Sequence, residues 1–191
     1  MKKIIATLVI ALCVVGSAMA QDELSFERKQ AIDSLALEKV RDLSKYVKIV
    51  GSKETSFSEA NRVIDRAEEL FMSNAEIGVS SVASNKVKYY KVRPYLEHLM
   101  RLNYDRVEIE WYNIEYVSDL QRQPDGTYVG VITIFQTFRG YDKEGHLAYK
   151  DTTKKDITVY VKRKETQIGG RTIGFWDVLL GDMRVKETVN K

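Results

Sequence analysis

The chain has 191 residues, of which 30 are lysine or arginine and 27 are aspartate or glutamate, giving a formal net charge of +3. Hydrophobic residues make up 44% and charged residues 30%, a balance that is typical of a folded domain and excludes a disordered chain. So small a net charge does not provide a surface for nucleic acid, and we predict no nucleic-acid partner.

The first twenty residues have the pattern of a secretory signal peptide. Lys2 and Lys3 precede an apolar run over residues 4–15, and Ala18 and Ala20 offer small side chains before Gln21. This order of charge, apolar run and small residues is what a signal peptidase recognises. We therefore predict a signal peptide at residues 1–20 and export to the periplasm or envelope of a Gram-negative bacterium.

The single cysteine, Cys13, lies inside this segment and follows Leu12 instead of the small residue that a lipoprotein signal needs. The mature chain would then have no disulfide, which fits a bacterial periplasm better than a small secreted animal domain. No later apolar segment is long enough to cross a bilayer, so we predict no membrane span.

Helical patterns occupy the first part of the mature chain. Apolar residues recur at helical spacing before Gly51, and residues 21–55 are predicted as an N-terminal helix with its connection. Ser56 with Glu59 three residues later predicts the start of a second helix. A short strand is expected over residues 75–82, and Arg93-Pro94 predicts the start of a third helix.

After Asn103 the chain is rich in β-branched and aromatic residues, which predicts strands. Four strands are expected, at about 104–118, 128–141, 146–163 and 171–185. The turns between them are predicted at residues 124–126, 142–145 and 169–170, where glycine occurs in each. Consecutive strands with short connections pair as an antiparallel meander.

The fold class predicted from these elements is α+β. N-terminal helices would pack on a strongly bent, mainly antiparallel sheet of four to five strands, with residues 56–191 as one domain. The apolar positions of the first long strand change parity near Trp111 and Tyr112, which predicts a β-bulge there.

From Ser56 to Val185 this order of elements resembles the nuclear transport factor 2-like superfamily, whose cone-shaped fold is also called cystatin-like. The stretch from Val79-Ser80-Ser81-Val82 through Tyr95-Leu96 to Trp111-Tyr112 also resembles exported proteins of Bacteroidetes. The resemblance implies a pocket between the concave face of the sheet and the helices. It implies no single activity, because the superfamily includes isomerases, cyclases, dehydratases, transport adaptors and binding or assembly domains.

Two polar residues interrupt the apolar strand faces that we expect to point inward. Gln136 shares one face of its predicted strand with Tyr128, Ile132, Ile134 and Phe138. Asp151 shares one face of the next predicted strand with six residues: Leu147, Tyr149, Thr153, Ile157, Val159 and Val161. A carboxylate held in an apolar pocket has a raised pKa and can act as a base. The simpler interpretation, which we favour, places Asp151 near a sheet edge, solvated and bonded to Thr153 or Lys154.

The candidate ligand-binding residues are the aromatic and polar side chains expected at the pocket: Tyr95, Trp111, Gln136, Phe138, Tyr149 and Asp151. Asp151 is also the one candidate catalytic residue. His98 and His146 have no partner at a spacing typical of metal ligands, and no nucleotide-binding or nucleophile motif occurs, so we predict no metal and no cofactor.

Two further surfaces are expected from the strands. Phe175 and Trp176 are adjacent and should point to opposite faces, which places one of them on the outer face of the sheet, where a homodimer contact is expected. The lysine-rich stretch from Lys150 to Lys164 is interpreted as a solvated strand edge, where lysines discourage edge pairing.

The missing catalytic motif favours a non-catalytic exported module that binds an apolar small molecule or an envelope protein. One alternative is a cofactor-independent isomerase or lyase that uses Asp151. A second alternative is a structural subunit of an envelope assembly, in contact with its partners through the first helix.

Overall fold

The computed structural model describes residues 24–82 and 84–189, so the predicted signal peptide and Cys13 lie outside the described residues. The chain divides into two units, one ending at Ala31 and one beginning at Ile32. In the described part of the first unit, helix α1 (Phe26–Gly51) begins after Ser25. The Ser25 hydroxyl oxygen accepts a hydrogen bond from the backbone N–H of Arg28 at 3.3 Å, as expected of a residue that caps a helix.

The second unit contains the remainder of α1 and two shorter helices, α2 (Phe57–Glu68) and α3 (Val92–Met100). The predicted start of α2 is confirmed, because the Ser56 hydroxyl oxygen accepts a hydrogen bond from the Glu59 N–H at 3.2 Å. Pro94 lies in the first turn of α3, where its missing N–H costs no hydrogen bond.

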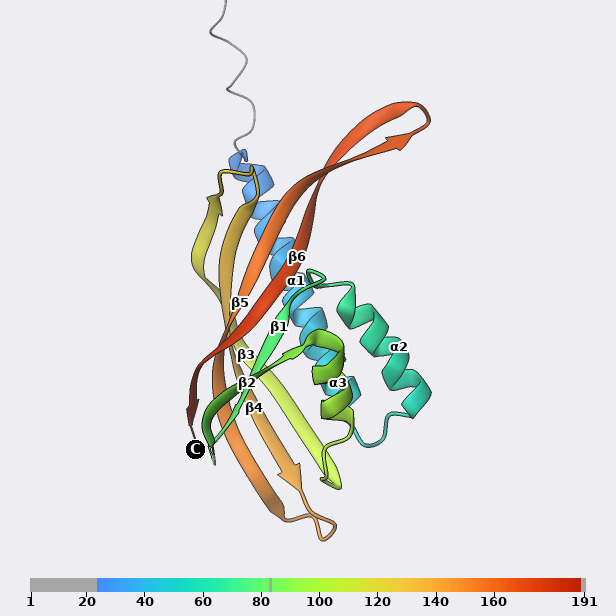
Figure 1. Ribbon diagram of the computed structural model, residues 1–191, viewed down its shortest axis with the longest axis vertical. Helices are drawn as coiled ribbons and strands as arrows, with labels where there is room; N and C mark the ends of the chain where they lie inside the picture. Colours follow the sequence, from blue (N-terminus) through green and yellow to red (C-terminus); the bar gives the residue numbers. More distant parts are fainter. Residues whose placement is uncertain (1–23, 83, 190–191) are drawn as a thin grey trace, which may run out of the picture. The chain divides into compact units, whose positions relative to one another are not determined.

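One sheet of six strands forms in the part of the chain that the structure describes: β1 (Glu76–Ser81), β2 (Ser84–Lys91), β3 (Arg106–Arg122), β4 (Tyr128–Tyr141), β5 (Leu147–Ile168) and β6 (Arg171–Val189). Their order is β2-β1-β6-β5-β4-β3, and only β1 and β6 pair in parallel. The α+β class and the mainly antiparallel sheet are therefore confirmed (Figure 1).

The sheet has more strands than predicted, because β2 pairs with β1 at the edge. Lys86, Lys88 and Lys91 interrupt its apolar residues, and lysine is common on edge strands, where it prevents pairing with other chains. A prediction based on the alternation of apolar residues therefore misses this strand.

The long strands bend strongly (Figure 1), and irregular pairing accounts for the bend. The register of β3 against β4 shifts between Tyr112 and Glu115, and Asn113 between them has φ +49°. The bulge predicted near Trp111 and Tyr112 is thus present directly after them. Each predicted turn contains a glycine with positive φ, such as Gly126 at +78°, a conformation that other L-residues rarely adopt.

The faces predicted to point inward form the core, with Ile132, Ile134, Ile157 and Val159 fully buried. Leu147 is the exception, because it begins β5 beside the turn and is 52% exposed. The C-terminal end of α1 packs on this core, since a Cβ added to Gly51 would lie 3.1 Å from the Ile109 side chain.

The interpretation of the lysine-rich stretch as a sheet edge is wrong. Strand β5 lies between β4 and β6, and the Lys155 side chain is only 2% exposed. A lysine at an inward position of a central strand must be buried, because side chains alternate between the two faces.

Phe175 and Trp176 differ in their surroundings, as expected of neighbours that point to opposite faces. Phe175 is 45% exposed, whereas the Trp176 ring packs edge-on against Tyr128. A homodimer contact at the outer face stays a prediction. No helix among the described residues is both long and apolar enough to cross a membrane.

Gly140 provides a first test of the packing beside α3. A Cβ at this position would lie 2.6 Å from the Tyr104 ring, closer than any real contact, so the ring must move. We expect Gly140→Ala to lower the free energy of unfolding by about 1–3 kcal/mol, measured by urea denaturation.

Gly174→Ala is the matched control, because its added Cβ would meet only the flexible Arg163 side chain at 3.3 Å. This variant should change the stability by less than about 0.5 kcal/mol. Equal effects of the two substitutions would show that the Tyr104 ring does not depend on Gly140.

Candidate functional site

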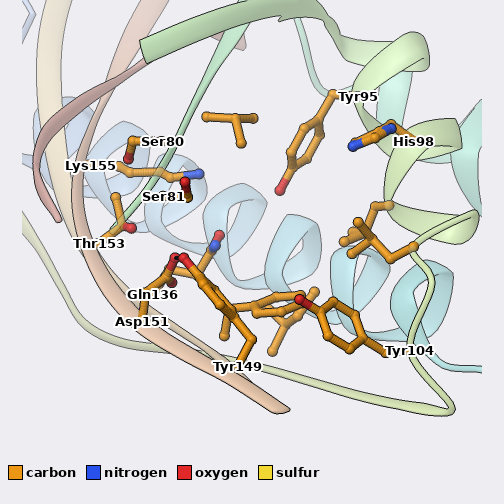
Figure 2. A pocket seen from close by; sticks show the side chains of 15 residues that line it. Ser80, Ser81, Tyr95, His98, Tyr104, Gln136, Tyr149, Asp151, Thr153 and Lys155 are labelled. Carbon is orange, nitrogen blue, oxygen red and sulfur yellow. Dashed lines mark hydrogen bonds between the residues drawn. The ribbon is translucent and has the colours of Figure 1, made fainter. Parts of the chain in front are cut away.

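A cavity of about 340 Å³ lies in the second unit, between helix α3 and the inner face of the sheet (Figure 2). Its apolar walls are formed by these side chains: Val79, Leu99, Leu102, Ile109 and Phe138. Its polar wall comes mainly from β4 and β5: Gln136, Tyr149, Asp151, Thr153 and Lys155. A volume of this size suits a small molecule.

The polar wall follows directly from strand geometry. Along β5, alternate residues from Tyr149 to Lys155 share one face of the sheet. Cross-strand pairing places Gln136 opposite Thr153 and Phe138 opposite Asp151. The sheet thus carries a row of polar groups into a space whose other walls are apolar.

Asp151 is 5% exposed and is held by Tyr149. The Tyr149 hydroxyl donates a hydrogen bond to Oδ2 of Asp151 at 2.7 Å and accepts one from the Val82 N–H at 3.3 Å. Burial raises the pKa of Asp151 above its ordinary range, although the Tyr149 hydrogen bond and the Lys155 charge act in the opposite direction.

Tyr149 serves as a fixed donor to the carboxylate. Its own pKa is raised to about 12, first by burial and then by the hydrogen bond to Asp151, so it stays protonated at neutral pH. Because Tyr149 uses Oδ2, the other carboxylate oxygen, Oδ1, has no side-chain donor among the described residues.

Lys155 lies farther along the same face and reaches toward α3. Its Nζ atom is 5.7 Å from the centre of the Tyr95 ring, a cation–π contact. Within residues 24–82 and 84–189, its ammonium has neither a hydrogen bond nor an ion pair. Burial lowers the pKa of Lys155 from its ordinary value of 10.5 to about 8, and the Asp151 charge only partly opposes this shift.

Tyr95 extends from α3 toward the same space (Figure 2). It is 7% exposed, and burial raises its pKa to about 12. In the part of the chain that the structure describes, its hydroxyl makes no hydrogen bond to the protein. Two polar groups, one charged and one neutral, thus face the cavity without a protein hydrogen-bond partner.

Gln136 is oriented by a residue behind it. The Trp111 indole N–H donates to Oε1 of Gln136 at 3.1 Å, and because an indole can only donate, the amide oxygen must face Trp111. The amide NH₂ of Gln136 has no other partner among the described residues, which leaves two donors for a ligand.

The structure brings together five of the six candidate ligand-binding residues, which line the cavity: Tyr95, Gln136, Phe138, Tyr149 and Asp151. Trp111 is not part of the lining and contacts the site through Gln136. The interpretation of Asp151 as a solvated residue at a sheet edge is wrong, since β5 is a central strand and Tyr149, not Thr153 or Lys154, is its partner.

Lys155 was missed as a site residue, although the sequence contains the signal. It has the same parity along β5 as Asp151 and Thr153, which were predicted to point inward. The lysine-rich composition of the stretch obscured that parity. Ser80, Ser81 and Thr153 are further polar lining residues, and their small hydroxyl side chains give no sequence signal.

The histidines have separate positions. His98 is exposed at the rim of the cavity and stacks on Tyr90 with 5.9 Å between ring centres. His146 lies in the turn after β4, where its ligand atoms and those of Asp142 and Glu144 lie within 4.8 Å of one another. This cluster is open to water, and the turn itself accounts for it, since the His146 N–H donates to Asp142 at 2.8 Å.

Comparison with protein-family models gave no match, and no curated protein is significantly similar in sequence. Two solved structures are similar. One is described as a putative scytalone dehydratase from Novosphingobium aromaticivorans, with 12% identity, 86% of this chain and 91% of that chain covered, and a TM-score of 0.46. The other is a hexachlorocyclohexane dehydrochlorinase (LinA), type 2, with 14% identity, 85% and 91% covered, and a TM-score of 0.41. Similarities this low assign no activity to the chain.

Replacement of Lys155 tests whether its burial opposes folding. Because the folded state holds the pKa of Lys155 at about 8 instead of 10.5, the charged form is disfavoured in the fold. Lys155→Met should therefore raise the free energy of unfolding at pH 7, by at most about 3 kcal/mol at about 1.4 kcal/mol per pKa unit.

The gain should be complete below pH 8 and should disappear as the pH rises toward 10.5, where the wild-type lysine is neutral in both states. Thermal unfolding between pH 6 and pH 11 measures it. Lys154→Met, at the neighbouring position on the opposite face, should show no such pH dependence. A loss of stability in Lys155→Met at pH 7 would mean that the ammonium holds the fold together.

Proposed function

We propose that the chain binds a small molecule in this cavity and transfers a proton without a cofactor, as an isomerase or a lyase. The observation that carries the proposal is the Asp151 carboxylate: the residue is 5% exposed, it faces a cavity with apolar walls, and its Oδ1 has no side-chain donor among the described residues. Buried carboxylates with a raised pKa are suited to act as general bases near neutral pH.

The chemistry needs only groups that line the cavity. Oδ1 of Asp151 would take a proton from the carbon next to a carbonyl group of the ligand. The electron pair of that C–H bond would form a C=C bond to the carbonyl carbon, while the π pair of the C=O bond moves to the carbonyl oxygen. An isomerase would return the proton to a different carbon. In a lyase the C=O bond would re-form and the bond from the neighbouring carbon to a leaving group would break. The leaving group would depart with that electron pair and take the proton from Asp151.

The negative charge that develops on the ligand oxygen needs donors that are already in place. The Gln136 amide faces the cavity with its N–H donors, and the hydrogen bond from Trp111 fixes its orientation. Donors held in an apolar space stabilise a developing oxyanion more strongly than water does, because they do not have to reorient. Tyr149 keeps Asp151 in one orientation throughout.

Export is part of the proposal and rests on residues 1–20 alone. A proton-transfer protein without a cofactor suits an envelope compartment, since it needs neither a nucleotide nor a reducing partner. A non-catalytic binding module in the same compartment would use the same cavity, and the difference between the two functions lies in what happens to the ligand.

Deuterium exchange separates catalysis from binding. The protein is incubated in D₂O with a panel of small cyclic ketones and β-hydroxycarbonyl compounds, each with and without a carboxylate group, and NMR follows deuterium incorporation next to the carbonyl carbon. We expect the wild-type chain to catalyse exchange in at least one compound, and Asp151→Asn to lower that rate by about 100-fold or more.

Asp156→Asn is the matched control, because Asp156 lies on the same strand but on the opposite face, where it accepts a hydrogen bond from Thr133 at 2.6 Å. Its exchange rate should equal that of the wild type. Exchange that persists in Asp151→Asn, or ligand binding without exchange anywhere in the panel, would contradict the catalytic proposal.

A further inference from the structure

One end of the cavity brings together an ammonium and a phenol hydroxyl. The Lys155 ammonium and the Tyr95 hydroxyl both reach this end, from β5 and from α3 respectively (Figure 2). Their side chains are 2% and 7% exposed, and neither polar group has a hydrogen-bond partner among the described residues. Burial removes most of the water around the Lys155 ammonium, and an anion bound in the cavity would compensate for that loss.

Asp151 does not act as the counter-ion of Lys155. In the described residues no ion pair within 4.0 Å joins Asp151 to Lys155, and the nearest partner of the carboxylate is Tyr149 at 2.7 Å. Four residues of extended strand separate the α-carbons of the two by about 13 Å. The hydroxyl of Thr153, which lies between them on the same face, forms a hydrogen bond with the Thr188 hydroxyl at 3.2 Å.

We propose that the ligand of this cavity carries a carboxylate, which binds Lys155 and Tyr95, with an apolar body that packs on Leu99, Ile109 and Phe138. This inference rests on the proposed function, and it names the substrate class. The group that loses a proton would then lie toward Asp151, and the fixed carboxylate would set which carbon faces the base.

The donor set fits a carboxylate better than a phosphate. One ammonium and one hydroxyl match a single negative charge shared by two oxygens. Sites for phosphate gather more donors, commonly arginine or several backbone N–H groups at a helix N-terminus. Beside Lys155, Ser80 and Ser81 add only hydroxyl groups to the lining (Figure 2), and none of the described lining residues is an arginine.

The test compares the binding of two probes of nearly equal shape, 3-phenylpropionate and its neutral amide 3-phenylpropanamide, by isothermal titration calorimetry at pH 7. The wild type should prefer the carboxylate by about tenfold or more, as for a hydrogen bond between charged groups. Lys155→Met should lose that preference, and Tyr95→Phe should reduce it. Lys154→Met, whose ammonium lies over Phe135 on the outer face, should bind like the wild type.

Three results would overturn the inference: equal binding of the two probes by the wild type, a preference that survives in Lys155→Met, or equal losses in Lys154→Met and Lys155→Met. Circular dichroism checks that each variant is folded. Asp151→Asn should keep the carboxylate preference, so a chain that selects the carboxylate but exchanges no proton would retain this site and lose only the catalytic proposal. Proton exchange without a preference for the carboxylate probe would retain the catalytic proposal and contradict this site.

Discussion

Side chains along β5 alternate between the two faces of the sheet, and this constraint puts a carboxylate and an ammonium inside the protein. Asp151 and Lys155 share the inward face with Ile157, Val159 and Val161, which are fully buried. Pairing with β4 on one side and β6 on the other leaves the strand no freedom to turn its polar residues toward water. The buried apolar residues of β5 therefore fix the register of the strand. That register places Asp151 and Lys155 in the cavity.

Such an arrangement opposes folding locally. Charged groups without an ion-pair partner within the described residues lower stability, and apolar residues of the same size would pack at less cost. Strain of this kind is concentrated at functional sites, where it prepares a group for its ligand. Tyr149 and Trp111 support this interpretation, since both use their hydrogen bonds to orient a cavity residue.

Much of the fold follows from local signals in the sequence. Glycine turns delimit β4 at Tyr128 and Tyr141, and Ser56 with Glu59 sets the start of α2, because these are short-range effects of backbone conformation and capping. Strand β2 was missed since its lysines conceal the alternation of an edge strand. Lys155 was missed for a related reason. The lysine-rich composition of its stretch indicated an exposed strand, whereas its place in the alternation along β5 indicated the buried face. Which polar groups would meet in one cavity depends on the pairing of β5 with β4 and on the position of α3, and neither is encoded locally.

The central claim, that Asp151 and Lys155 are buried charges kept for a ligand, can be tested by measuring their ionisation. NMR titration of a protein labelled with ¹³C in aspartate and lysine side chains follows both groups directly. The structure predicts that Asp151 titrates above its ordinary value of 3.8 and that Lys155 titrates at about 8. Titration of Asp151 near 3.8 and of Lys155 near 10.5 would show that both groups are solvated, and would contradict the account of the cavity as a site for a small acid.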